Sequence, residues 1–169
     1  MSAKELLNRK KFAAAQAWLA PILGFVRVGF RGYSQRSQGF IAAKSWLLKN
    51  SFTGQGEDLD IDPVLVKVSS GDLPNPENIA VEFTETGNLK FTWNPVYVDL
   101  LDKDQIMMLA YDTEKAQAVF ITTGQFRSTG VDILDMKQSI GNYHVYAAFN
   151  AADRSRQSDS VYLGEWKFP

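Results

Sequence analysis

The sequence predicts an α+β protein in which an N-terminal helical region precedes an antiparallel β-sandwich. Apolar residues recur every three or four positions up to about residue 50, and every second position from about residue 64 onward. In the second part, short alternating segments are separated by turn residues at close intervals, a pattern typical of sandwiches and barrels. With 169 residues and 45% hydrophobic content, the chain is long enough for one good core or two modest ones.

The first 50 residues are expected to form three helical segments. Ser2 and Glu5 have the spacing of a capping box, so the first helix should begin there. Pro21 should kink or end it, because proline lacks a backbone N–H and clashes with the carbonyl four residues earlier. A short segment at 22–28 follows, and a third helix should stop near Asn50. Four aromatic residues at helical spacing are expected in the core between the helices: Phe12, Trp18, Phe40 and Trp46.

Beyond the helices, residues 51–62 should form an acidic, glycine-containing connector before a first strand at 64–68. The predicted domain division is therefore a basic helical region at 1–50, the connector and first strand at 51–71, and the sandwich at 72–169. Trp93 should lie buried between the sheets, since it follows Leu89 and Phe91 on the same face of a strand. The other expected strands are 79–83, 89–93, 106–111, 116–123, 131–136, 143–149 and 160–166.

Two segments of the C-terminal part are similar to strands of fibronectin type III domains. Residues 73–81 and 89–95 resemble the first two strands of that family, and Trp93 matches the tryptophan at the end of its second strand. Residues 143–150 resemble the penultimate strand, and 158–161 the start of the last one. The resemblance covers roughly 95 residues and implies a fibronectin type III or immunoglobulin-like sandwich. It also favours an extracellular or cell-surface location.

The whole chain resembles an uncharacterised bacterial family, a domain of unknown function. The resemblance is carried by residues 7–12, 25–30, 43–50, 71–74 and 160–164. Members of that family usually have a glycine-rich, strand-like segment before the basic helix, and this chain starts without it. The expectation is that the segment was removed by processing, was cut away or was never present. The resemblance brings no activity with it.

The charge is divided unevenly along the chain. Residues 1–50 hold nine Lys or Arg and one acid, for a net charge of +8, whereas residues 51–169 hold nine Lys or Arg and eighteen acids, for a net charge of −9. Such a division indicates a polyanionic partner, docking of one part on the other, or head-to-tail association. Residues 27–36 interleave arginines with aromatic residues, which can bind phosphates and stack on bases. The candidate interaction residues are Arg27, Arg31, Tyr33 and Arg36.

No pattern of catalytic residues stands out in the sequence. His144 is the only histidine, and strand alternation places it on the outward face. Cysteine is absent, and no cofactor or metal site is expected. The alternating acids Asp58, Asp60 and Asp62 suggest a calcium loop, yet Pro63 stands where that loop requires glycine, so a solvated loop is favoured.

The sequence therefore predicts a non-enzymatic binding or structural assembly protein that associates with itself or with another protein. In the favoured form it makes head-to-tail homo-oligomers through the basic helices and the acidic sandwich. A second interpretation is polyanion (nucleic acid) binding through the basic helices, and a third is a carbohydrate-active protein. No membrane span is expected, because no run of about 18 to 20 apolar residues occurs.

Overall fold

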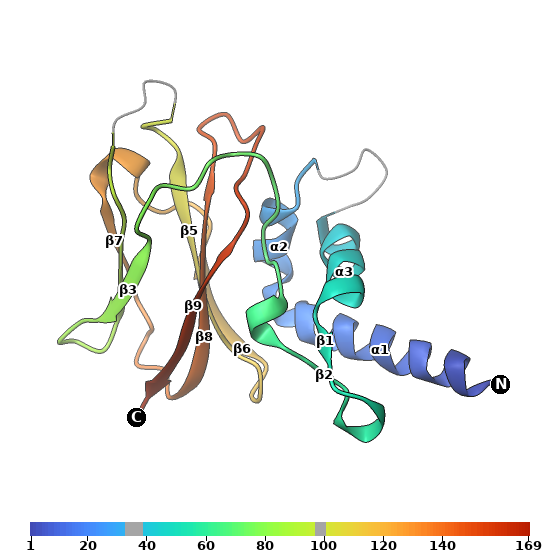
Figure 1. Ribbon diagram of the computed structural model, residues 1–169. Coiled ribbons are helices and arrows are strands. Elements are labelled where there is room, and N and C mark those ends of the chain that lie inside the picture. Colours follow the sequence, from blue (N-terminus) through green and yellow to red (C-terminus); the bar gives the residue numbers. More distant parts are fainter. Residues whose placement is uncertain (33–38, 97–100) are drawn as a thin grey trace.

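The computed structural model describes residues 1–32, 39–96 and 101–169, which form an α+β fold in three layers. A three-stranded antiparallel sheet packs on a four-stranded antiparallel sheet, and the helices lie on the other side of the four-stranded sheet (Figure 1). The coarse α+β prediction is confirmed.

The helical layer comprises α1 (Ala3–Leu19), α2 (Leu23–Gly29) and α3 (Gly39–Asn50). The predicted capping box is present: the Ser2 hydroxyl accepts from the Glu5 N–H at 3.2 Å, and the Ser2 N–H donates to the Glu5 carboxylate at 2.7 Å. Pro21 lies in a 3₁₀ turn, Ala20–Ile22, that separates α1 from α2. The break between α1 and α2 therefore occurs at Pro21, as predicted from the lack of a backbone N–H in proline.

The connector contains a small hairpin of β1 (Phe52–Thr53) and β2 (Asp60–Ile61), with 3₁₀ turns at Gly56–Asp58 and Pro63–Leu65. The strand expected at 64–68 is wrong. Val66 and Val68 are buried as the alternation predicts, but Asp62 caps the 3₁₀ turn at Pro63–Leu65. The Val68 N–H then donates to the Ser160 hydroxyl at 3.0 Å instead of joining a strand ladder.

The remaining seven strands occur where alternation predicts them, within a few residues. The three-stranded sheet has the order β3-β4-β7, and the four-stranded sheet the order β6-β5-β8-β9, with every pair antiparallel. A further 3₁₀ turn, Arg127–Thr129, precedes β7. The strands are β3 (Ala80–Phe83), β4 (Leu89–Thr92), β5 (Gln105–Asp112), β6 (Gln117–Ile121), β7 (Val131–Leu134), β8 (Gly141–Asn150) and β9 (Val161–Phe168).

One hydrophobic core fills the space between the two sheets. It combines Leu89 and Phe91 of β4 with alternate residues of β5 and β8, such as Met108 and Val145. Trp93 belongs to this core and is 4% exposed, which confirms its predicted position. Its indole N–H donates to the Arg127 carbonyl at 2.7 Å, so the polar edge of the ring is satisfied inside the core.

A second core joins the helices to the outer face of the four-stranded sheet. Leu19, Phe25 and Leu47 of the helices pack with Met107 of β5 and Tyr146 of β8. Because both faces of β5 are covered, its residues from position 106 to 112 are all buried. The helical region thus shares a core with the sheet that follows it in the chain, while the domain division proposed from the sequence stays a prediction.

Candidate functional site

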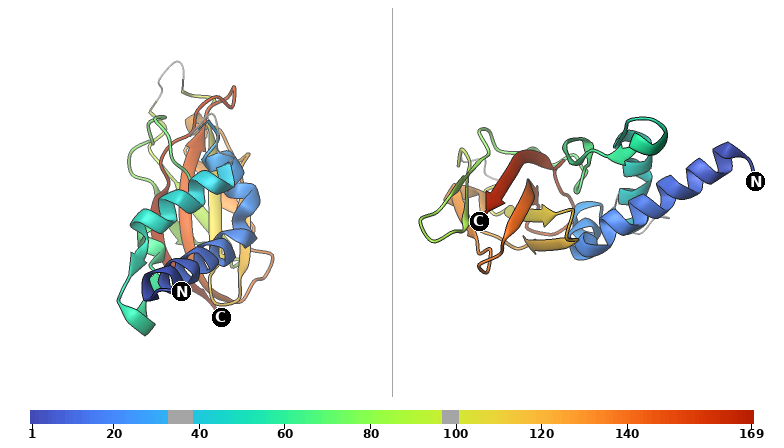
Figure 2. Two further views of the ribbon diagram at one scale, coloured as in Figure 1. Left: turned by 90° about the vertical axis from the view of Figure 1, so that its right-hand side faces the viewer. Right: turned by 90° about the horizontal axis from the view of Figure 1, so that it is seen from below.

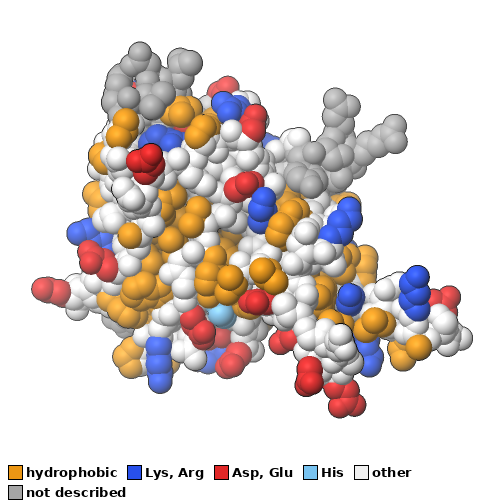
Figure 3. Space-filling model, in the orientation of Figure 1, with side chains coloured by type: hydrophobic (Ala, Val, Ile, Leu, Met, Phe, Trp, Pro, Cys, Tyr) orange, Lys and Arg blue, Asp and Glu red, His pale blue; other side chains and the backbone are white. Residues whose placement is uncertain are grey.

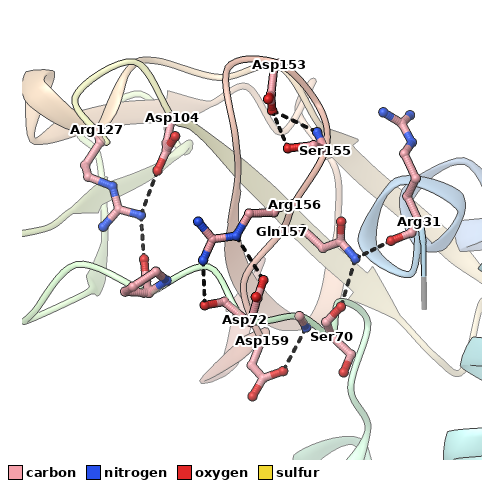
Figure 4. A network of polar contacts seen from close by, with 12 residues as sticks. Arg31, Ser70, Asp72, Asp104, Arg127, Asp153, Ser155, Arg156, Gln157 and Asp159 are labelled. Carbon is pink, nitrogen blue, oxygen red and sulfur yellow. Dashed lines mark hydrogen bonds and ion pairs between the residues drawn. The ribbon is translucent and has the colours of Figure 1, made fainter. Parts of the chain in front are cut away.

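The candidate interaction residues begin at the end of α2. Arg27 is exposed in the last turn of that helix, and Arg31 is exposed just beyond it. Arg31 donates to the Arg154 carbonyl at 3.4 Å, and its own carbonyl accepts from the Gln157 side chain at 2.7 Å (Figure 4). The other two candidates, at positions 33 and 36, lie outside the described residues.

Two glycines allow separate backbone segments to approach closely near Arg31. A Cβ on Gly29 would lie 2.3 Å from the Val68 carbonyl oxygen, and one on Gly71 would lie 2.0 Å from the Gln157 carbonyl oxygen. No larger residue fits at these distances without a backbone shift. Both glycines belong to segments on which the family resemblance was based. Gly29 lets the end of α2 approach residues 68–69, and Gly71 lets the end of that same connector approach the chain before β9.

The charges of the two parts do not neutralise each other through ion pairs in the described structure. All of the ion pairs found among the described residues lie within positions 67 to 159: Lys67–Asp159, Lys90–Glu82, Arg127–Asp104 and Arg156–Asp72. The helices instead dock on the sheet through apolar packing. Two of the basic side chains in this layer rest on aromatic rings, with the Lys44 Nζ 4.1 Å from the centre of Phe12 and the Lys11 Nζ 5.3 Å from that of Phe52.

The N-terminal half of α1 projects beyond the rest of the molecule (Figures 1 and 2). On its flank lies a groove of about 530 Å³ between α1 and the β1–β2 hairpin. Leu6 and Leu7 are 49% and 39% exposed, although large apolar side chains usually lie inside a fold. In Figure 3 the projecting end shows hydrophobic and basic side chains next to one another. Residues that line the groove include Leu6, Leu7, Lys10, Lys11, Phe52 and Leu59.

One of the aromatic residues expected in the helical core is on the surface instead. Phe12 is 52% exposed, whereas Trp18, Phe40 and Trp46 are partly buried against the core. Helical spacing identifies an apolar face but does not say whether a neighbour covers it. The N-terminal part of α1, before its first buried residue Ala15, projects past the sheet. An exposed apolar binding face was the less favoured interpretation of this aromatic spacing, and the exposed side of α1 is a candidate interaction surface.

His144 lies on the face of β8 that points away from the inter-sheet core, as the alternation predicts. The side chain is half-buried rather than freely exposed. Its Nδ1 lies 2.8 Å from the Tyr162 hydroxyl. Burial lowers the pKa of His144, and the carboxylates of Glu165, Asp112 and Asp62 oppose that shift. The imidazole therefore stays neutral down to a lower pH than a solvent-exposed histidine does.

A buried ion pair that the sequence did not indicate joins Arg127 to Asp104 at 3.2 Å (Figure 4). Their side chains are 5% and 2% exposed, and burial raises the pKa of Asp104 although the arginine opposes it. The same guanidinium donates to the Pro74 carbonyl and lies 5.0 Å from the centre of the Phe149 ring. The Arg127 guanidinium thus ties the loop before β7 to Asp104 before β5 and to Pro74 before β3, and so serves the fold.

The acidic connector does not assemble a metal site in the described structure. The Asp60 carboxylate accepts from the Ile61 N–H at 2.8 Å, and that of Asp62 accepts from the Val64 N–H at 3.0 Å. Among residues 1–32, 39–96 and 101–169, no group of three or more His, Asp or Glu side chains could hold a metal ion. Two of the alternating acids therefore cap local backbone.

Residues Ala3–Gly29 form a 27-residue helical stretch that is long and apolar enough to cross a membrane, judged by length and composition. Its most apolar window has a mean hydropathy of 1.3, and 39% of that window is buried in the fold. Core helices of folded proteins meet the same criterion. The expectation that the chain has no membrane span stays a prediction.

Comparison with known proteins identifies a family relationship. The model of a family of unknown function, DUF6266, matches residues 4–164 and so spans both the helices and the sheets. No curated protein and no solved structure matches the chain.

Proposed function

This chain belongs to the DUF6266 family, whose function is unknown, and we propose that it is a non-enzymatic binding or structural assembly protein. In this proposal, copies associate head to tail, with the basic helical region of one copy meeting the acidic sheet region of the next.

The proposal includes a finer description of the sheets as a fibronectin type III-like sandwich. Its support is the strand order β3-β4-β7 on one side and β6-β5-β8-β9 on the other. Trp93 at the end of β4, buried against Phe149 of β8 with ring centres 5.3 Å apart, is consistent with that description. Domains of this architecture commonly serve as interaction modules, although a fold by itself does not establish a function.

The observation that carries the assembly proposal is the apolar docking of the helices on the sheet. If the charges of the two regions had paired within one molecule, the attraction between them would already be satisfied. Among the described residues no ion pair crosses between residues 1–50 and the remainder, so the positive charges described in the helical region are not neutralised by carboxylates of the same molecule. Net charges of +8 and −9 then favour a contact between unlike surfaces.

A contact between two different surfaces is heterologous, and it produces a ring or an open filament depending on whether the rotation closes. The test measures the mass of the protein by light scattering and sedimentation at low and high salt. The parent should form oligomers that weaken as salt is added, because exposed ion pairs are screened. Reversing Arg27, Arg31 and Arg36 to Glu should shift the population toward monomer.

A matched control separates the specific contact from a general effect of net charge. Reversing Lys103, Lys137 and Lys167, which are exposed in the sheet region, changes the net charge by the same amount and should leave the oligomer in place. A parent that remains monomeric at high concentration, at every salt concentration, would contradict the proposal.

The same excess of basic residues in the first 50 positions favours a second candidate, binding of a polyanion such as nucleic acid. Retention on heparin or on single-stranded DNA would then fall steeply with salt, because phosphate contacts release counterions. Loss of retention in the Arg27, Arg31 and Arg36 variant, with no oligomer at any salt concentration, would favour this candidate over assembly.

A further inference from the structure

We infer that the pocket between Asn75 and Arg127, at one end of the two-sheet region, binds an uncharged peptide segment through a backbone amide. This site is separate from the surfaces of the proposed assembly, so the outcome of one test does not decide the other.

The pocket lies where several connections of the two sheets meet. It has a volume of about 230 Å³, and its walls come from the segments before β3, β5 and β7 and from the segment after β4. These segments come together at one end of the sheets (Figure 1). Loops held by a rigid scaffold are a common place for binding residues.

Arg127 brings unused hydrogen-bond donors to this pocket. Its Nη2 donates to the Pro74 carbonyl and, at 3.2 Å, to the Asp104 carboxylate (Figure 4). Its Nε is buried and has no hydrogen-bond partner among the described residues, and its Nη1 donates to none of them either. The side chain is only 5% exposed, so an N–H without an acceptor is costly there and an acceptor that binds would be stabilised.

Asn75 brings the complementary acceptor. Its Nδ2 donates to the Asp159 carbonyl at 2.9 Å, which fixes the orientation of the amide. Its Oδ1 is buried and accepts no hydrogen bond from a described residue. The Arg127 guanidinium binds the carbonyl of Pro74, the residue before Asn75, so the unused donors and the unused acceptor lie in the same part of the pocket. A peptide unit satisfies both, because its C=O accepts and its N–H donates.

The charges around the pocket favour an uncharged ligand. The charge of Arg127 is compensated by Asp104, with which it forms a buried ion pair. Glu77 is exposed and also lines the pocket, so an anion would meet its carboxylate, whereas a cation would meet the guanidinium. Phosphates and free carboxylates therefore fit this site less well than an amide.

The size and the walls of the pocket favour a peptide over a sugar or a whole small molecule. Pockets that enclose drug-sized ligands measure about 300 to 1,000 Å³, so this one suits a part of a longer chain. Its apolar lining includes Pro74, Pro76, Leu101 and Val96, which is 60% exposed. The many hydroxyl groups of a sugar would lose their hydrogen bonds against these side chains, whereas small apolar side chains of a peptide would not.

The test is an NMR titration of the isotope-labelled full chain. The probe is the capped peptide acetyl-Ala-Ala-Ala-amide, and its control is the same peptide with methylated backbone nitrogens, which cannot donate to Asn75. The first peptide should shift the Nε–H resonance of Arg127 saturably. The methylated peptide should bind about fivefold more weakly, the loss expected for one hydrogen bond. Acetate and glucose at the same concentration should leave the resonance unchanged.

Two variants test the assigned residues. Asn75→Ala should weaken binding of the probe about fivefold, whereas Asn142→Ala, which replaces an exposed asparagine at the other end of β8, should bind like the parent. Val96→Asp places a charge on the apolar wall and should also weaken binding. Its control is Val64→Asp, since Val64 is 57% exposed and lies outside the pocket. Circular dichroism confirms that each variant is folded.

The inference is overturned if the probe produces no saturable shift, or if the Arg127 Nε–H exchanges only with a long-lived bound water that the probe does not displace. A stronger response to acetate or to glucose overturns the choice of a peptide. Binding that is unchanged in folded Asn75→Ala and Val96→Asp variants places the probe elsewhere and overturns the site.

Discussion

Replacing Trp93 by Ala should strongly destabilise the two-sheet region. The indole is 4% exposed, packs edge-on against Phe149 and donates a 2.7 Å hydrogen bond to the Arg127 carbonyl. Aromatic side chains bury about 150 to 250 Å² each. At about 25 cal/mol per Å², this burial corresponds to roughly 4 to 6 kcal/mol as an upper estimate. Measured Trp→Ala changes in cores cost about 3 to 5 kcal/mol.

The loss should appear as a lower midpoint of urea unfolding, followed by circular dichroism, and as a fall in Tm of about 6 to 20 °C. Trp93→Phe is the matched comparison, because it keeps most of the apolar volume and removes the hydrogen bond. It should cost about 1 to 3 kcal/mol, since the Arg127 carbonyl loses its donor. If the Ala variant melts within one or two degrees of the parent, the ring does not contribute to the core as argued.

Three further outcomes follow from particular contacts. Gly71→Ala should cost about 1 to 3 kcal/mol in urea unfolding, because its Cβ would meet the Gln157 carbonyl oxygen, whereas Gly24→Ala, opposed only by the movable edge of a phenylalanine ring, should cost less. His144→Gln should leave the fold intact at pH 7.5. Burial lowers the pKa of His144, so the unfolded chain binds a proton before the folded one does, and the parent should lose stability as pH falls below about 6.5. The variant should show a smaller loss between pH 7.5 and 5.5, and equal losses would refute this assignment. Asp104→Asn should cost about 3 to 5 kcal/mol, since it leaves a buried arginine unpaired, and a neutral effect on the urea midpoint would show that the pair adds little.

Part of the candidate site could be predicted from composition and spacing alone. The excess of basic residues before position 50 pointed to the helical region. Arg27 and Arg31 are exposed at the end of α2, and their role in an interaction stays a prediction. The groove was not predicted, because its two walls come from α1 and from a hairpin some 40 residues later in the chain. Leu6 and Leu7 follow the same pattern as buried helix residues, so periodicity could not show that they are uncovered.

The sequence by itself determined the positions of the helices and of the strands in the two larger sheets. Capping at Ser2, the break at Pro21 and the alternation that places Trp93 inside all depend on neighbours within a few residues, and local spacing encodes them directly. It also determined the division of charge between the first 50 residues and the rest.

Only the tertiary structure decided which faces meet. The helices cover the outer face of the four-stranded sheet, so β5 is buried on both sides. His144 is half-buried beside Tyr162 of the neighbouring strand β9. Both contacts depend on the volume and shape of side chains distant in sequence, and alternation records a face without recording what covers it. For the same reason Phe12 proved exposed while Leu19, on the same helix, is fully buried.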